Sequence, residues 1–188
     1  MHFKHPLLLA SGSPRRRQLL AEAGFAFSLK MKSVPEDFPA DMPAAEVPVM
    51  LARRKAQALR DELSDEVVLA ADTVVVVDGD ILNKPAGEDE AFSMLSRLSG
   101  RMHQVITGVC LLSREKTVTL SDLTEVHFRA LTADEIDYYI RRYRPYDKAG
   151  AYGVQEWIGM VGIEKMTGSY FNVMGLPVHR VYEELMKW

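Results

Sequence analysis

Apolar and polar positions alternate along this 188-residue chain in a way that predicts strands and helices in turn. An apolar run at 7–10 predicts a short buried strand. Ser13 followed by Pro14 is typical of a helix start, and the helix is expected to run to about residue 23. After it, alternating apolar side chains over 25–31 predict a half-buried strand.

The rest of the chain continues this succession of elements. Three prolines and three acids mark residues 33–43 as a loop, and the apolar spacing predicts a helix from 47 to 59. β-Branched runs predict strands at 67–71 and 74–77, with Asp72 and Thr73 between them. Further expected elements are a helix over 91–98, strands at 103–112 and 117–128, a helix opened by the capping box of Thr132 and Glu135, a strand at 158–164, and a helix from Pro177 to about 187. We therefore predict an α/β fold with a mixed sheet.

Composition narrows the class of protein without identifying it. Hydrophobic residues make up 47% of the chain and charged residues 26%, as in soluble globular proteins. The length of 188 residues suggests one domain, or two small lobes that share one core, and we expect a single domain over residues 1–188. The formal net charge of −3 argues against a broad basic face for nucleic acid. The apolar runs are too short for a membrane span or a signal peptide, and the single cysteine, Cys110, permits no intramolecular disulfide. We expect a cytoplasmic protein that binds neither nucleic acid nor membrane.

The segment from Ser11 to Arg17 leaves the first predicted strand and enters the first predicted helix. Free backbone N–H groups and the positive end of the helix dipole make such a helix start an anion site. Ser11 and Ser13 add hydroxyl donors, and three consecutive arginines add guanidinium groups suited to phosphate oxygens. The segment is therefore a candidate phosphate cradle. An ordinary helix cap with solvated arginines is the alternative.

Asp72 is the second candidate, because it interrupts two apolar strand segments. A carboxylate in such surroundings is costly to bury unless it is paired or bound to a cation. Carboxylates at strand ends serve as ligands for divalent metals or as bases for water, and we favour such a role for Asp72. A structural aspartate that caps a turn is the alternative.

Lysines and a glycine-rich stretch supply further candidates. Lys55, Lys84 and Lys148 could join the arginines around a triphosphate, although a single lysine is most often a solvated surface residue. Gln155 follows glycines that allow close approach of a ligand, and its amide can both donate and accept toward a base edge. Tight turns around core aromatics are the alternative for these glycines. His103 is interpreted as a histidine of the sheet rather than a metal ligand.

Together these segments closely resemble the Maf family of nucleoside triphosphate pyrophosphatases, once described as septum-formation inhibitors. The resemblance covers nearly the whole chain and rests on ordered motifs at 9–16, 51–56, 71–75, 83–85, 98–108, 147–155 and 168–177. It implies an elongated α/β fold similar to that of inosine triphosphate pyrophosphatases. In that fold, helices flank a mixed, twisted sheet, and an active-site cleft lies between two lobes.

The resemblance also implies an activity, which is the metal-dependent hydrolysis of a nucleoside triphosphate to the monophosphate and pyrophosphate. Asp72 matches the family's proton acceptor, and Asp72 with Glu36 matches its ligands for a divalent cation such as Mg²⁺ or Mn²⁺. The phosphate-contacting positions of the family match Ser11, Arg15, Arg16, Lys55 and Lys84. The positions that separate the dTTP/UTP branch from the 7-methyl-GTP branch are here Arg15, Thr73 and Gln155. The chain is therefore similar to the dTTP/UTP branch, with a nucleoside triphosphate as its partner.

The chain departs from the family pattern at two places. Arg54 stands where an acid is common, and Glu156-Trp157 replaces small residues after Gln155, beside the expected base pocket. The sequence also leaves open a homodimer and the ranking of modified pyrimidine nucleotides. Two other function classes remain as alternatives: a non-catalytic nucleotide-binding regulator of septum formation and, less favoured given the net charge, a nucleic-acid-binding protein.

Overall fold

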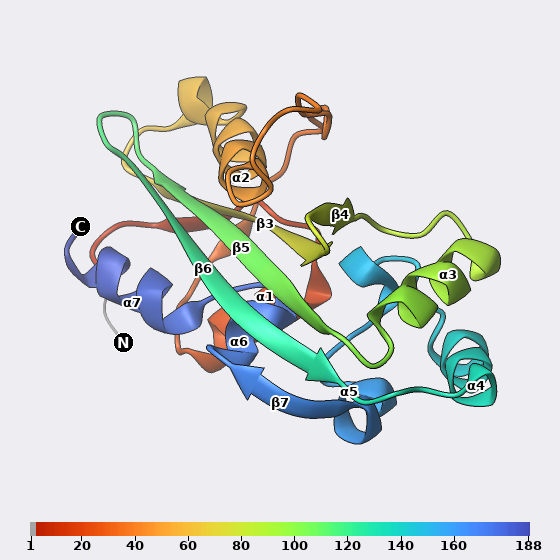
Figure 1. The fold of residues 1–188 in the computed structure, drawn as a ribbon. Helices are drawn as coiled ribbons and strands as arrows, with labels where there is room; N and C mark the ends of the chain where they lie inside the picture. The colour runs from red at the N-terminus through yellow and green to blue at the C-terminus, as the bar shows by residue number, and fades with distance from the viewer. Residues whose placement is uncertain (1–2) are drawn as a thin grey trace. The chain divides into compact units, whose positions relative to one another are not determined.

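The computed structural model describes residues 3–188, which form seven strands and seven α-helices (Figure 1). The chain divides into two compact units. Unit 1 contains the residues up to Thr73 together with Thr107–Asp122 and Gly175–Trp188, and unit 2 contains Val74–Ile106 and Leu123–Met174. Three long strands contribute residues to both units: β3 (Val67–Val77), β5 (Met102–Leu112) and β6 (Thr117–Phe128). The single domain and the cleft between lobes stay predictions.

One mixed sheet holds the seven strands of the described chain, in the order β2-β1-β3-β5-β6-β7, with β4 paired to β3. β1 (Leu7–Leu9) runs parallel to β2 (Ser28–Leu29) and to β3. β4 (Asp80–Leu82) is antiparallel to β3, and β7 (Ile163–Thr167) is antiparallel to β6. The predicted α/β class and the mixed sheet are confirmed.

In unit 1, helix α2 (Val47–Gln57) packs on one face of the sheet. Ala52 and Ala56 of this helix belong to a buried apolar cluster that also contains Leu8, Val68 and Cys110. Helices α1 (Pro14–Glu22) and α7 (Val178–Met186) lie on the opposite side of the strands (Figure 1). Burial raises the pKa of the Cys110 thiol to about 11, so this residue belongs to the core rather than to any chemistry.

The start of α2 makes a close approach to β5 at Gly108. A Cβ atom at this position would lie 2.3 Å from the backbone carbon of Pro48 and 2.3 Å from the backbone nitrogen of Val49. Only glycine leaves room for this contact. The approach fixes α2 against the sheet, and α2 carries the predicted site residue Lys55.

In unit 2, helix α3 (Glu88–Leu98) packs against α4 (Ala133–Tyr143). α4 begins with the predicted capping box, in which the Thr132 hydroxyl accepts from the Glu135 N–H and the Glu135 carboxylate accepts from the Thr132 N–H. His103 is buried against the rings of Phe128 and Tyr152, and its Nε2 lies 2.7 Å from the Tyr152 hydroxyl. Burial lowers the pKa of His103 to about 3, which makes it a neutral histidine of the core.

Two predicted elements differ from the structure in extent. The half-buried strand predicted over 25–31 is reduced to β2, and both β2 residues are exposed because β2 is an edge strand of the sheet. The strand predicted at 158–164 begins instead as helix α5 (Trp157–Gly162), and strand β7 starts at Ile163. The Glu156 carbonyl accepts from the N–H groups of Gly159 and Met160, which starts the helix. An apolar run this short does not reveal by its period which structure forms.

The remaining described elements are short. They are helix α6 (Tyr170–Met174) and 3-10 turns at Arg60–Glu62 and Ala149–Ala151. Between residues 3 and 188, no helix has both the length and the apolar character that crossing a membrane requires.

Candidate active site

The segment from Ser11 to Arg16 leaves the end of β1 and enters the first turn of α1, as predicted. The Ala10 N–H donates to the Leu69 carbonyl at 2.8 Å, which extends the contact between β1 and β3 up to the turn. The Ser13 hydroxyl accepts from the Arg16 N–H at 3.4 Å, so Ser13 is the N-cap of α1. The first turn of α1 contains no acidic residue, so no carboxylate of that turn offsets the positive end of the helix dipole.

The guanidinium group of Arg16 is held by three acceptors from different parts of unit 1. Its Nε donates to the Gly175 carbonyl at 2.7 Å, Nη1 to the Ser11 hydroxyl at 3.2 Å, and Nη2 to the Thr73 hydroxyl at 3.0 Å. Withdrawal from water lowers the pKa of Arg16, and the charge of Asp72 opposes that effect. Arg16 is therefore fixed in orientation by neutral oxygens, and its positive charge is not neutralised by a carboxylate hydrogen bond among these contacts.

Thr107 extends the hydrogen-bonded group around Arg16, although sequence reasoning did not assign it a role. Its hydroxyl lies 2.9 Å from the Thr73 hydroxyl, and the residue is fully buried in β5. Thr73 thus contacts Arg16 on one side and Thr107 on the other. A signal was present in the sequence, because Thr107 is a polar residue between the apolar positions of a predicted strand.

The ammonium group of Lys55 bridges two carboxylates. Lys55 Nζ lies 2.6 Å from Asp72 Oδ1 and 2.7 Å from Glu36 Oε1. The exposed fractions of the Lys55 and Asp72 side chains are 18% and 15%, whereas that of Glu36 is 51%. Asp72 lies inside the continuous strand β3 rather than between two strands, which corrects the predicted boundary. Lys55, Asp72 and Glu36, three of the predicted site residues, therefore lie together in unit 1.

Arg54 explains how the proline-rich loop is held near α2. Its Nη1 donates to the carbonyls of Pro35 and Asp37 at 2.6 and 2.8 Å and to the Asp37 carboxylate at 3.0 Å. Glu36 lies between these two anchored residues. The first departure from the family pattern therefore has a structural role, because an arginine next to Lys55 on α2 fastens the loop that carries Glu36.

The donor set of Asp72 and Glu36 fits a divalent cation of the Mg²⁺ type. Both carboxylates reach the same ammonium nitrogen, so they are close enough to share one cation. Oxygen ligands suit Mg²⁺ and Mn²⁺, and Mg²⁺ is commonly bound by one or two carboxylates with phosphates and water as further ligands. No group of three or more His, Cys, Asp or Glu side chains suited to a metal occurs within residues 3–188.

Comparison with known proteins assigns the chain to a family. The model of the Maf-like protein family matches residues 6–188. The chain belongs to the Maf-like proteins. A Porphyromonas gingivalis protein named dTTP/UTP pyrophosphatase is 51% identical over 186 residues, covering 97% of this chain and 94% of the relative. Relatives of the same name from Phocaeicola vulgatus and Cytophaga hutchinsonii are 50% identical (98% of this chain, 96% of the relative) and 49% identical (96% and 83%).

The other predicted site residues of this Maf-like protein have no contact with Arg16 or Lys55 among the hydrogen bonds and ion pairs described above. Arg15 is half-buried and Arg17 is exposed, as expected for consecutive positions of a helix. Lys84 and Gln155 belong to unit 2. There the Gly150 N–H donates to the Asn83 carbonyl at 3.2 Å, which places the turn before Lys84 beside the glycine-rich stretch. The structure therefore brings six predicted residues together in two sets within unit 1. Arg16 contacts Ser11 and Thr73, Lys55 contacts Glu36 and Asp72, and the two sets meet at the neighbouring residues Asp72 and Thr73 of β3.

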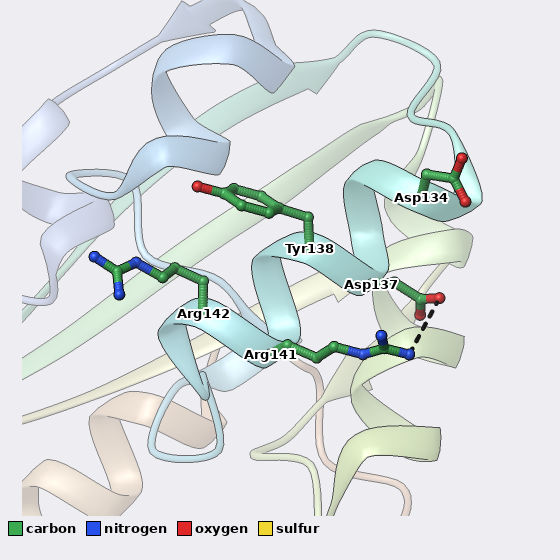
Figure 2. A pocket seen from close by; sticks show the side chains of 5 residues that line it. All are labelled: Asp134, Asp137, Tyr138, Arg141 and Arg142. Atoms are coloured by element: carbon green, nitrogen blue, oxygen red, sulfur yellow. Dashed lines mark ion pairs between the residues drawn. The ribbon is translucent and has the colours of Figure 1, made fainter.

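A pocket of about 550 Å³ lies at the surface of α4 and is separate from these site residues (Figure 2). None of the predicted site residues lines it, and its walls are formed by Asp134, Asp137, Tyr138, Arg141 and Arg142. Figure 2 shows Arg141 reaching back toward Asp137 along the same helix, at 3.9 Å. The Tyr138 ring packs edge-on against Trp157 at 4.9 Å. These contacts are typical of a solvated helix surface rather than of convergent catalytic groups.

Proposed function

We propose that this Maf-like protein hydrolyses dTTP and UTP to the nucleoside monophosphate and pyrophosphate. Three relatives with that activity in their names are 49–51% identical to the chain over nearly its whole length. The structural observation that carries the proposal is the Lys55 ammonium between Asp72 and Glu36. Such a group of one cation and two acids offers both a base for water and charge for a polyphosphate.

Asp72 is proposed as the proton acceptor. Its Oδ1 is bound by Lys55, which orients the carboxylate and leaves Oδ2 to take a proton from a water molecule. The oxygen of that water forms a bond to phosphorus while the bond to the departing phosphate oxygen breaks, so that the linkage between the α- and β-phosphates is cleaved. Water at neutral pH is a poor nucleophile, and removal of its proton by a positioned base accelerates such attack by about 10²–10⁴-fold.

The cationic residues are proposed to offset the charge that develops on the departing pyrophosphate. Arg16 is held in place before substrate arrives, so no free energy is spent on ordering its side chain during the reaction. The Ser11 hydroxyl next to it is a further phosphate contact. We assign the remaining phosphate contacts to Arg15, Lys55 and Lys84.

We propose that a divalent cation is the cofactor and that Asp72 and Glu36 hold it. A bound Mg²⁺ or Mn²⁺ supplies Lewis-acid polarisation of phosphate oxygens. Lys55 keeps both carboxylates in place and balances their charge when the protein has no nucleotide. Arg54 contributes indirectly by anchoring the loop around Glu36.

Base selection is proposed to depend on Arg15, Thr73 and Gln155, the positions that match the dTTP/UTP branch. Thr73 also fixes Arg16, so its role combines selectivity with positioning of a phosphate ligand. The proposal extends to one functional domain over residues 1–188 and to a cytoplasmic location, which a buried, unpaired Cys110 supports. A homodimer stays a prediction.

A panel of nucleoside triphosphates tests the function. The purified chain is incubated with dTTP, UTP, CTP, GTP and 7-methyl-GTP, with and without Mg²⁺, and the products are separated and identified. We expect monophosphate and pyrophosphate from dTTP and UTP in the presence of Mg²⁺. Release of orthophosphate would contradict the reaction type, and preference for 7-methyl-GTP would contradict the branch. Binding of dTTP without turnover would instead favour the non-catalytic regulator.

A further inference from the structure

Glu156 follows Gln155 directly, in place of the small residue that the family pattern led us to expect. Its side chain is only 17% exposed and contacts two other residues of unit 2. Glu156 Oε1 lies 3.2 Å from Lys148 Nζ, and Glu156 Oε2 accepts a hydrogen bond from the Tyr139 hydroxyl. Tyr139, Lys148 and Glu156 are called the Glu156 clamp below.

The clamp is also bound to the backbone of the loop that it encloses. The Gly153 N–H donates to the Tyr139 hydroxyl oxygen at 3.0 Å. A Cβ atom at position 153 would lie 2.8 Å from Glu156 Cδ and 3.1 Å from Lys148 Cε, so the clamp packs directly on the glycine backbone. Burial, together with the Glu156 carboxylate, raises the pKa of Tyr139, so its hydroxyl keeps the proton that it donates.

The position of the clamp in the sequence indicates that it restrains the glycine-containing stretch 149–155. Lys148 and Glu156 flank residues 149–155, a stretch that contains Gly150 and Gly153. Glycine loses more backbone conformational freedom on folding than any other residue. This stretch therefore needs contacts that hold it in one conformation. Because Lys148 and Glu156 are 9% and 17% exposed, their ion pair is sheltered from the water and salt that weaken pairs on the surface.

Gln155 lies at the end of this stretch and directly precedes Glu156 in the sequence. Its Oε1 atom is buried and has no hydrogen-bond partner among the described residues. An unsatisfied buried acceptor costs about 1–3 kcal/mol, a cost that a donor arriving with a ligand would remove. Uracil and thymine carry such a donor, the ring N3–H, between two carbonyl oxygens that can accept from an amide NH₂. Cytosine presents an acceptor at N3 and therefore cannot satisfy Gln155 Oε1 in the same way.

We propose that Glu156 is a positioning residue that holds Gln155, through Lys148 and Tyr139, so that the Gln155 amide recognises the N3–H edge of uracil or thymine. The proposal rests on the proposed function, because that function supplies the substrate. It also accounts for the second departure from the family pattern, since the added carboxylate fastens the loop from within unit 2. Glu156 makes no contact with substrate in this account.

The Glu156→Gln variant tests the proposal, because it keeps the shape of the side chain and removes its charge. We expect KM for UTP to rise about fivefold while kcat stays within about twofold, since the loss affects binding of the base. The preference for UTP over CTP, measured as the ratio of kcat/KM values, is expected to fall. Inhibition by inorganic triphosphate, which has no base, is expected to stay unchanged. Glu164→Gln, the same substitution at an exposed position of β7, is the matched control.

A double-mutant cycle shows whether Glu156 acts through Gln155. In a Gln155→Ala background, Glu156→Gln should change KM for UTP by less than about twofold, because the group that it positions is absent. Tyr139→Phe should reproduce the effect of Glu156→Gln from the other side of the clamp. Additive effects of Glu156→Gln and Gln155→Ala would overturn the proposal, as would an unchanged UTP to CTP ratio. Failure of the proposed function is distinct, because the wild-type chain would then release no pyrophosphate from UTP.

Discussion

Lys55 Nζ lies 2.6 Å from Asp72 Oδ1, and both side chains are largely withdrawn from solvent. The contact joins helix α2 to the middle of strand β3, so a cation and a carboxylate are held together by two elements of the core of unit 1. The same ammonium also reaches Glu36 in the proline-rich loop. A change at Lys55 therefore affects both acids at once.

Substitution of Lys55 by methionine is expected to lower kcat/KM for UTP by about 10²–10³-fold. The variant loses a cation that offsets charge on the departing pyrophosphate, and electrostatic groups of this kind contribute that much to catalysis. Steady-state kinetics of pyrophosphate release measure the effect. Arg53→Met, on an exposed position of the same helix, is the control and should retain activity. Equal activity of the two variants would show that Lys55 has no part in the reaction.

Thr107→Val is expected to raise KM for UTP about fivefold without loss of the fold. Valine has nearly the shape of threonine but cannot form a hydrogen bond with the Thr73 hydroxyl. Thr73 is then less well oriented to accept from Arg16. Thr107→Ser restores a hydroxyl and should recover most of the affinity. The account of Arg16 would be contradicted if valine and serine at this position gave the same KM.

His103 is expected to make stability depend on pH between about 6.5 and 3. The pKa of His103 is about 3 in the folded chain, below the usual histidine value, because the ring is buried. Below the unfolded pKa the unfolded chain binds a proton that the folded chain does not, so stability falls as pH falls through this window. Urea unfolding at pH 7 and pH 5 measures the change. His103→Gln should show a smaller difference between the two pH values, and an identical difference would contradict the assignment.

Gly108→Ala is expected to destabilise the chain and to reduce activity together. The added Cβ would lie 2.3 Å from the backbone of α2 at Pro48, so helix and strand must separate, at a cost of about 1–3 kcal/mol or more. The shift displaces the helix that carries Lys55. Thermal unfolding and turnover are measured on the same preparation. Gly87→Ala is the control, because no atom lies within 4 Å of a Cβ built there. It should leave turnover nearly unchanged and cost at most about 1 kcal/mol of stability, since Gly87 is the N-cap of α3 and alanine is a poorer cap.

Local chemistry allowed much of the fold to be predicted. Ser13-Pro14 and the pair Thr132 and Glu135 mark helix starts through contacts within a few residues, and the structure contains both. The strand over 25–31 and the strand at 158–164 were wrong in extent because burial at a sheet edge and the backbone contacts of the Glu156 carbonyl depend on the tertiary fold. Propensity and period do not contain that information.

In the candidate site, too, local features could be predicted from the sequence, whereas contacts that depend on the tertiary fold could not. Asp72 was recognisable because a lone carboxylate in an apolar strand is costly. Its contacts with Lys55 and Glu36 join residues from a helix, a strand and a loop, and no spacing in the sequence shows that they converge. Sequence reasoning gave no role to Thr107, and it did not show that Glu156 contacts Tyr139 and Lys148, because these contacts join residues that are separated in the sequence.

The most direct test of the central claim compares pyrophosphate release from UTP by the wild-type chain and by Asp72→Asn, with Mg²⁺ present. Asparagine keeps the size of the side chain but cannot take a proton from water, so we expect a loss of about 10²–10⁴-fold in kcat with the fold intact by circular dichroism. Pyrophosphate release by a folded Asp72→Asn variant at the wild-type rate would contradict the assignment of Asp72 as the base.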